Sequence, residues 1–277
     1  MNPSYKQNLQ PKEGWVVIHL FYTINHAAWE ELGEQQQNEA LARLSNLVLS
    51  INSSENTQLL ALSMLTPKAD LGFMLLTPDL HAANRWEKDL GRSLGPEILE
   101  ATFCFLSLTE RSEYTTTEED YADQIRGEHP ENSPEFETAM QTFRDRMQKY
   151  AQDRLYPNMP DWPVFCFYPM SKKREAGQNW YALPFEERKT LMAGHAKIGR
   201  TFSGRVRQLI TGSTGLDDAE WGVTLFAHDP VDIKEIVYQM RFDEVSARYA
   251  DFGQFYIGLQ LPLSEIFTRA GLWPTSG

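Results

Sequence analysis

Two polar side chains, His195 and Gln208, stand within apolar stretches of the sequence. The helix expected over residues 184–202 places four side chains on one face: Leu191, His195, Ile198 and Phe202. The strand expected over residues 205–211 places three side chains on one face: Val206, Gln208 and Ile210. Neutral imidazole is a common ligand of haem iron, and this pair is suited to bracket a flat, apolar ligand with a metal ion. The alternative is a packed histidine and a glutamine bonded to the backbone.

A strand that ends in a basic run supplies further candidate groups. Tyr168 stands at the end of the apolar strand 164–168, and the run Lys172, Lys173 and Arg174 follows it. Local basic groups of this kind bind carboxylates, and Arg241 and Ser246 are further candidates for the same task. The alternatives are a structural tyrosine, a solvated basic loop and a surface ion pair.

Composition restricts the classes of partner and compartment. The 277 residues carry a net charge of −12, which argues against nucleic acid or an anionic membrane as the main partner. The two cysteines, Cys104 and Cys166, have no metal-binding spacing, and we expect both to be buried strand thiols in a reducing compartment. The sequence has neither an apolar signal segment nor an apolar run near the ~20 residues of a membrane span, so a cytoplasmic protein is expected.

Hydrophobic periodicity indicates a repeated β-α-β-β-α-β order of elements. In the first half we expect strands at 15–24, 59–65, 71–76 and 99–108, and helices at 34–49 and 79–94. In the second half we expect strands at 164–168, 205–211, 220–227 and 253–261, and helices at 184–202 and 231–240. Gly72, Leu75 and Asp79 correspond to Gly222, Leu225 and Asp229 at one constant offset. The sequence therefore predicts an α+β protein in which two fused ferredoxin-like units form a dimeric α+β barrel within one chain.

The predicted units cover residues 1–109 and 161–277, and an acidic connector covers residues 110–160. The first part of the connector is rich in Glu and Asp, which is typical of a solvated linker. Residues 133–153 follow helical spacing, with four apolar side chains roughly on one face: Phe136, Met140, Phe143 and Met147. A connector of this length is usually functional or mobile.

Four long blocks of the second half resemble one family, the coproheme decarboxylases, which are relatives of chlorite dismutase. The blocks are FYPMSKKRE (167–175), NWYALPFEERKTLMAGHAKIGR (179–200), ITGSTGLDDAEWGVTLF (210–226) and VYQMRFDEVSARYADFGQFYIG (237–258). They stand in the right order and cover most of residues 165–258. The first half is similar to the family mainly in its pattern of elements.

The resemblance implies that the second half binds an iron porphyrin and that the subunits assemble as a ring-shaped pentamer. His195 matches the iron ligand on one side of the porphyrin, and Gln208 matches the residue on the other side. Chlorite dismutases hold an arginine at that place, so Gln208 favours the decarboxylase branch. Tyr168 matches the tyrosine that becomes a radical and takes hydrogen from a propionate, and Lys172 matches the lysine beside the carboxylates. Further positions match contacts with the porphyrin: Tyr114, Arg154, Met170, Arg241 and Ser246.

The implied reaction is the stepwise oxidative decarboxylation of two of the four propionates of iron-coproporphyrin III (coproheme) to vinyl groups. Hydrogen peroxide is the oxidant and haem b the product, so the porphyrin is both substrate and redox centre. A transient contact with a ferrochelatase is also expected. Two alternatives stay open: a chlorite dismutase that converts chlorite to chloride and dioxygen, and a haem carrier or sensor without catalysis.

Overall fold

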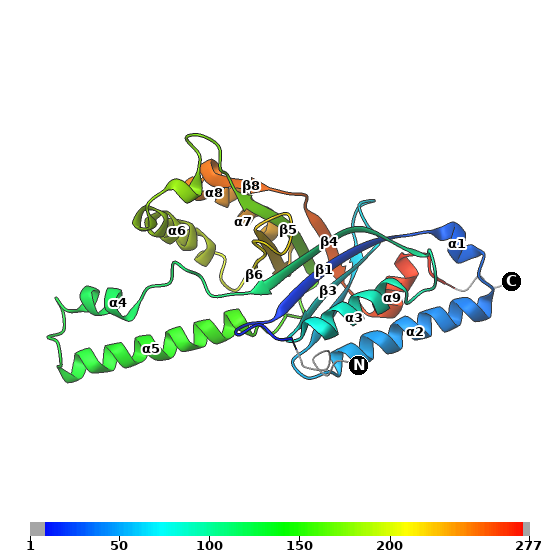
Figure 1. Ribbon diagram of the computed structural model, residues 1–277, viewed down its shortest axis with the longest axis horizontal. Helices are drawn as coiled ribbons and strands as arrows, with labels where there is room; N and C mark the ends of the chain where they lie inside the picture. The colour runs from blue at the N-terminus through cyan, green and yellow to red at the C-terminus, as the bar shows by residue number, and fades with distance from the viewer. Residues whose placement is uncertain (1–8, 274–277) are drawn as a thin grey trace, which may run out of the picture.

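The structure is a computed structural model that describes residues 9–273 (Figure 1). The first half contains β1 (Val16–Ile24), α1 (His26–Glu30), α2 (Glu34–Asn52), β2 (Gln58–Met64), β3 (Leu71–Thr77), α3 (Leu80–Gly91) and β4 (Leu99–Thr109). The second half contains β5 (Val164–Lys172), η2 (Trp180–Ala182), α6 (Phe185–Arg200), β6 (Val206–Gly212), β7 (Trp221–Ala227), α7 (Pro230–Met240), α8 (Glu244–Tyr249), β8 (Ala250–Phe252), β9 (Tyr256–Gln260) and α9 (Leu263–Arg269). The predicted order of elements is confirmed; the predicted strand 253–261 is β9, and the short elements α1, η2, α8, β8 and α9 are additional. The outer ends of the two predicted units, 1–8 and 274–277, lie outside the described residues.

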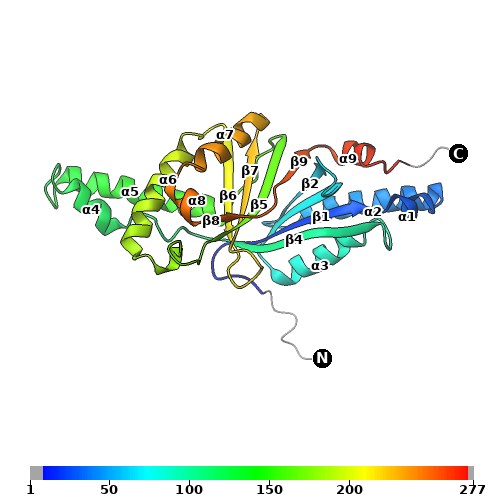
Figure 2. The ribbon, with the colours of Figure 1, turned by 90° about the horizontal axis from the view of Figure 1, so that it is seen from above.

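The strands form one antiparallel sheet that closes on itself. Their order is β7-β6-β4-β1-β3-β2-β9-β5-β8, and β7 also pairs with β5. In each half the first strand lies between the third and the fourth, as in a ferredoxin-like unit. The halves join where β4 meets β6 and where β2 meets β9. The predicted barrel of two fused units is therefore confirmed, and Figure 2 shows the two halves side by side.

The repeat predicted from the constant offset is visible in matched backbone geometry. Asp79 precedes α3 with φ −122° and ψ 121°, and Asp229 precedes α7 with φ −121° and ψ 129°. Each carboxylate accepts a hydrogen bond from the backbone amide two residues further on. Gly72 and Gly222 both lie against aromatic rings, since a β-carbon would fall 3.1 Å from Phe21 in one case and 2.8 Å from Phe105 in the other.

Aromatic side chains fill the interior of the barrel. Buried residues from both halves pack there: Val17, Phe21, Leu62, Met74, Leu76, Phe105, Phe165, Phe167, Leu209, Phe226 and Tyr256. The rings of Phe21 and Tyr256 stack with centroids 4.4 Å apart, and His19 stacks on Phe167 at 3.9 Å. A ligand of the barrel therefore has to bind on its outside, between the strands and the helices.

The connector contains two packed helices, α4 (Glu118–Ile125) and α5 (Pro134–Leu155), which extend away from the barrel (Figure 1). The predicted helix is confirmed as α5, which Ser133 caps. The predicted solvated linker is wrong over residues 118–125. Thr117 and Asp120 form a capping box that starts α4, and Ile125 packs on Phe136 and Met140.

The two cysteines differ in exposure. Cys166 is buried in β5, as predicted, and burial raises the pKa of its thiol to about 12. The prediction for Cys104 is wrong, because this residue is exposed on β4. β6 pairs with β4 only at Leu108 and Thr109, so the earlier part of β4 has no strand on that side within the described residues. Within residues 9–273, no helix is both long and apolar enough to cross a membrane.

Candidate functional site

A cavity of about 1050 Å³ lies outside the barrel, where α6 faces the strands of the second half and the connector approaches them. Eight of the nine predicted site residues line it: Tyr114, Arg154, Tyr168, Met170, Lys172, His195, Gln208 and Ser246. They come from the connector, from strands β5 and β6 and from helices α6 and α8. The structure thus brings together residues that are spread over more than a hundred positions of the sequence.

The cavity exists because α6 does not pack closely on the sheet. None of the residues of α6 is buried, and the helix packs on α7 and α8. Phe202, just after α6, is fully buried among Val206, Ile233 and Ile236, which anchors that end of the helix. The inner side of α6 therefore forms one wall of the cavity, and the outer face of β5, β6 and β7 forms the other.

His195 is held from behind by a buried carboxylate. Its Nδ1 lies 2.7 Å from Oδ2 of Asp243, which also accepts a hydrogen bond from the backbone amide of Ser246 at 3.2 Å. Burial opposes ionisation of Asp243, but the contact with His195, the Ser246 amide and the charge of Lys172 outweigh it and lower its pKa. An ionised Asp243 accepts the Nδ1 proton, which leaves the Nε2 lone pair for a metal ion.

Lys172 is a buried cation in the wall of the cavity. Its side chain is largely covered, and Nζ lies 4.5 Å from the centroid of the Trp180 ring. Burial lowers its pKa to about 8, against the charges of Asp243 and Glu220, which act to raise it. The solvated-loop interpretation therefore fails for Lys172, and its neighbour Lys173 is half-buried.

Tyr168 presents a protonated phenol to the same cavity. Its ring stacks on Phe255 with centroids 4.4 Å apart and lies 5.9 Å from the ring of Phe252. Burial raises the pKa of the phenol, and the neighbouring thiol of Cys166 adds to that effect, whereas the charge of Arg241 opposes it. The hydroxyl group therefore keeps its proton at neutral pH.

Gln208 faces the cavity from β6. Val206 and Ile210 lie on the same face and pack in the cluster beneath α7, as the strand period predicted. In the part of the chain that the structure describes, the Gln208 amide makes no hydrogen bond to protein, so it is not the backbone-bonded core glutamine of the alternative interpretation. A neutral donor is thus available to a ligand.

The remaining lining residues make the cavity basic in an acidic protein. Arg154 donates from Nε to the backbone oxygen of Glu110 at 3.2 Å, and Tyr114 stacks on Phe185 with centroids 5.9 Å apart. Burial raises the pKa of Tyr114 to about 12, so its hydroxyl stays protonated as a donor. The charged residues that line the cavity are Arg111, Arg154, Lys172, Arg200 and Arg207, against Glu110 and Glu113.

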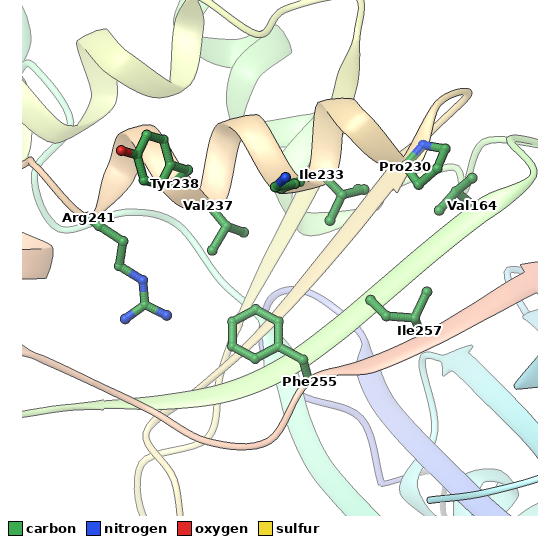
Figure 3. A pocket seen from close by; sticks show the side chains of 9 residues that line it. Val164, Pro230, Ile233, Val237, Tyr238, Arg241, Phe255 and Ile257 are labelled. Carbon is green, nitrogen blue, oxygen red and sulfur yellow. The ribbon is translucent and has the colours of Figure 1, made fainter. Parts of the chain in front are cut away.

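Arg241 is the predicted site residue that does not line this cavity. It lies at the end of α7, beside a separate apolar groove of about 460 Å³ between α7 and strands β5 and β9 (Figure 3). Its guanidinium lies 4.0 Å from the centroid of the Phe252 ring. Phe252 also contacts Tyr168, so Arg241 acts on the site through its charge across this ring.

Sequence reasoning missed three residues of the site: Asp243, Glu220 and Trp180. Asp243 follows α7 and caps α8, and the spacing Asp243–Ser246 is a helix-start signal. That signal predicts the cap but not the contact with His195, which is 48 positions away. Glu220 and Trp180 lie within blocks that carried the resemblance, yet no local pattern shows that both act on Lys172.

One imidazole in an apolar slot, with carboxylate-binding groups around it, fits an iron ion whose other ligands come from a porphyrin. The Nε2 atom of His195 could supply the nitrogen, and Met192, Ile210 and Val223 line the cavity with apolar surface. Lys172, Arg154 and Ser246 could supply donors for carboxylates from the walls of the cavity. The donor set therefore matches a flat metal complex that carries several carboxylates.

Comparison with known proteins places the chain in a family. The family model described as chlorite dismutase matches residues 37–261. A solved structure described as a novel heme-binding protein from Thermus thermophilus is 34% identical, with a TM-score of 0.78, over 96% of this chain and 100% of that chain. Chlorite dismutase from Candidatus Nitrospira defluvii in complex with imidazole is 18% identical, with a TM-score of 0.69, over 94% of this chain and 96% of that chain, a likeness of fold alone. The chain therefore belongs to the chlorite dismutase-like family.

Proposed function

We propose that this protein binds iron-coproporphyrin III and converts two of its propionates to vinyl groups with hydrogen peroxide, giving haem b. The observation that carries the proposal is the placement of Tyr168 and Lys172, from one strand, in the same cavity as His195. A cavity of about 1050 Å³ is at the upper end of the range of ligand pockets, which suits a ligand as large as a tetrapyrrole.

The chain's own residues divide the task of binding. Nε2 of His195 binds the iron, and Asp243 fixes the orientation of the ring and increases its basicity. Lys172, Arg154, Ser246 and Tyr114 bind the propionates. Met170 adds an apolar contact from β5, and Arg241 contributes its charge from the neighbouring groove.

Tyr168 is the residue that exchanges a hydrogen atom with the substrate. When bound, the iron supplies the reaction with peroxide that oxidises the site. Tyr168 keeps its proton, so it gives up a hydrogen atom and not an electron alone, and the resulting tyrosyl radical takes a hydrogen atom from a propionate side chain. In total, each propionate consumes one hydrogen peroxide and one proton and yields one vinyl group, one carbon dioxide and two waters. Lys172 holds the reacting carboxylate beside Tyr168.

The neutral amide of Gln208 supports decarboxylation over chlorite decomposition. A positively charged arginine at this place would stabilise an anionic oxygen species more strongly than an amide does. Gln208 is neutral and, among the described residues, has no hydrogen-bond partner, so it directs the oxidising equivalents to Tyr168 and not to formation of an O–O bond. A chlorite dismutase would evolve dioxygen from chlorite at high turnover, and we expect none.

The test is a titration of the protein loaded with iron-coproporphyrin III by hydrogen peroxide, followed by mass spectrometry of the porphyrin. We expect the loss of two carboxyl groups in the wild type. Tyr168→Phe should keep porphyrin binding and lose decarboxylation. The matched control is Tyr256→Phe, because Tyr256 is a buried tyrosine of the barrel interior and should be dispensable. An active Tyr168→Phe variant would contradict the role of Tyr168, and intact propionates in the wild type would indicate a carrier or sensor.

The proposal includes assembly and location. The chain is proposed to form a homo-oligomer, a pentamer, in the cytoplasm, and to receive its substrate through a transient contact with a ferrochelatase. The mass of the particle in solution tests the first part.

A further inference from the structure

Glu220 is a buried carboxylate that the proposed reaction does not use. It stands just before β7, and only 4% of its surface is exposed. Its Oε2 accepts a hydrogen bond from the backbone amide of Lys172 at 2.7 Å, and its Oε1 accepts one from the guanidinium of Arg174. Its own backbone amide donates to the oxygen of Met170 at 3.1 Å and to Oγ of Ser171 at 3.2 Å.

These bonds fix the end of β5 and the start of the loop that follows it. The backbone amide of Lys173 donates to the oxygen of Tyr249, and that of Trp180 donates to the oxygen of Lys173. The indole ring of Trp180 is thereby placed against the ammonium group of Lys172. The position of Lys172 in the cavity wall therefore depends on a frame whose buried anchor is Glu220.

The electrostatic surroundings of Lys172 depend on the same residue. Two carboxylates from different elements face Lys172: Glu220 before β7 and Asp243 before α8. Asp243 already interacts with His195, and Glu220 already interacts with Arg174. Both charges oppose the loss of the Lys172 proton that burial promotes.

We propose that Glu220 is a positioning residue for carboxylate binding, which holds the backbone of Lys172 and keeps its ammonium group charged at the cavity wall. The proposal rests on the proposed function, because the carboxylate is a propionate of the porphyrin. Its chemistry is otherwise independent of the iron and of peroxide. A purely structural anchor would hold the loop without influencing the protonation of Lys172.

The experiment measures the dissociation constant of iron-free coproporphyrin III between about pH 6 and pH 10, where ordinary carboxylates are already ionised. The iron-free porphyrin is the probe because it carries no iron-bound water that titrates, and its fluorescence reports binding. Carboxylate binding requires the protonated form of Lys172, whose pKa is about 8. The wild type should therefore bind the porphyrin at full affinity below that pH and lose affinity as the pH rises through it.

Four variants separate the two roles. Glu220→Gln should move the midpoint of the alkaline loss of affinity to lower pH, on the order of one pH unit. Arg174→Gln should move it to higher pH by a smaller amount, because the Glu220 charge is then less neutralised. Lys172→Arg should abolish the alkaline loss, since the guanidinium stays charged. The matched control is Glu175→Gln, which removes an exposed carboxylate from the loop that follows β5 and should leave the midpoint unchanged.

Opposite shifts in Glu220→Gln and Arg174→Gln would support the proposal. A uniform loss of affinity in Glu220→Gln with an unchanged midpoint would overturn it, as would an alkaline loss that persists in Lys172→Arg. If Glu220→Gln does not fold, Arg174→Gln decides, and an unchanged midpoint there overturns the proposal. A protein that shows these shifts but does not decarboxylate coproheme would contradict the proposed function and leave the role of Glu220 intact.

Discussion

Helices α2 and α6 occupy equivalent places in the two halves of the barrel, but they relate to their sheets in opposite ways. In the first half, α2 places Ala40, Leu44 and Ile51 against the sheet, and all three are fully buried. In the second half, α6 has no buried residue, and the space beneath it is the cavity of about 1050 Å³. Figure 1 shows α2 below the strands of its half and α6 beside α7 and α8.

The difference teaches how one fold supplies both a core and a binding site. The first half gains stability from the apolar face of its helix. The second half holds its helix from the side instead. Leu191 and Met192 of α6 pack on a small apolar cluster of Trp180, Val245 and Tyr249. Polar contacts then join α6 to α8 through His195 and Asp243 and to the connector through Lys189 and Asp120. A site is thus obtained by leaving one helix off the sheet, while the strands of both halves keep the barrel closed.

The largest expected effect is on stability and comes from shortening a buried side chain of α2. Leu44→Ala should lower the free energy of unfolding by about 2–5 kcal/mol, because Leu44 is fully buried and its removal leaves a void. Met192→Ala, on the inner side of α6, should cost only about 1 kcal/mol, because Met192 is half-buried: one side packs on the apolar cluster that contains Trp180 and the other faces the cavity. Chemical denaturation of both variants checks this, and equal losses would mean that α6 is as tightly packed as α2.

The second effect concerns the carboxylate behind His195. Asp243→Asn keeps the shape and the helix cap but removes the charge that orients and polarises the imidazole ring. We expect the affinity for iron-coproporphyrin III to fall on the order of 10–100-fold. Iron-free coproporphyrin III, titrated at a pH well below 8 so that Lys172 stays charged, is the control and should bind almost unchanged. An equal loss for both porphyrins would show that Asp243 shapes the pocket and does not act through the metal ligand.

Local patterns in the sequence were sufficient for the elements and for the repeat. The alternation around Gln208 and the helical spacing around His195 each reflect a single element, which is the range that periodicity covers. The offset that links Asp79 to Asp229 reflects the duplication of such elements. The barrel followed because two ferredoxin-like sheets have free edges that pair with each other. These features were therefore predictable from a single sequence.

Features that depend on two distant elements were not predictable. The contact of His195 with Asp243 joins two helices, and the burial of Lys172 depends on Trp180 and Glu220 from elements later in the chain. The exposure of Cys104 follows from where β6 stops pairing with β4, which is a property of the sheet and not of the strand. Helix α4 was hidden by its acidic composition, although its capping box was legible in the sequence.

A smaller effect on stability should distinguish the two glycines of α6 when each is replaced by alanine. Gly194 is exposed, and a β-carbon there would meet nothing within 4 Å, whereas one on Gly199 would lie 3.4 Å from Nε2 of Gln208. Gly194→Ala should therefore stabilise the protein by up to about 1 kcal/mol, since alanine favours a helix over glycine. Gly199→Ala should gain less and should weaken porphyrin binding, because its β-carbon would lie 3.3 Å from Cε of Met240 and in contact with Gln208, both in the cavity lining. Thermal unfolding and porphyrin titration of the pair check this, and a destabilised Gly194→Ala variant would mean that the outer side of α6 is covered.

The smallest effect concerns the contact that joins the connector to α6. Nζ of Lys189 donates to Oδ2 of Asp120 at 2.7 Å, and this bond, with those from the Thr117 amide and hydroxyl, lowers the pKa of Asp120 to about 2. In the unfolded chain the pKa of an aspartate is about 3.9, so the lower pKa of Asp120 in the folded state stabilises the fold above that pH. The stabilisation is lost as the pH falls through about 2. Lys189→Gln should move the pKa of Asp120 back toward its ordinary value, which a titration of the carboxyl carbon by NMR measures. Lys149→Gln, which breaks only the pair with Asp153 within α5, is the control. If Asp120 kept its low pKa without Lys189, the capping box alone would account for it, and this ion pair would add nothing to the link between the connector and α6.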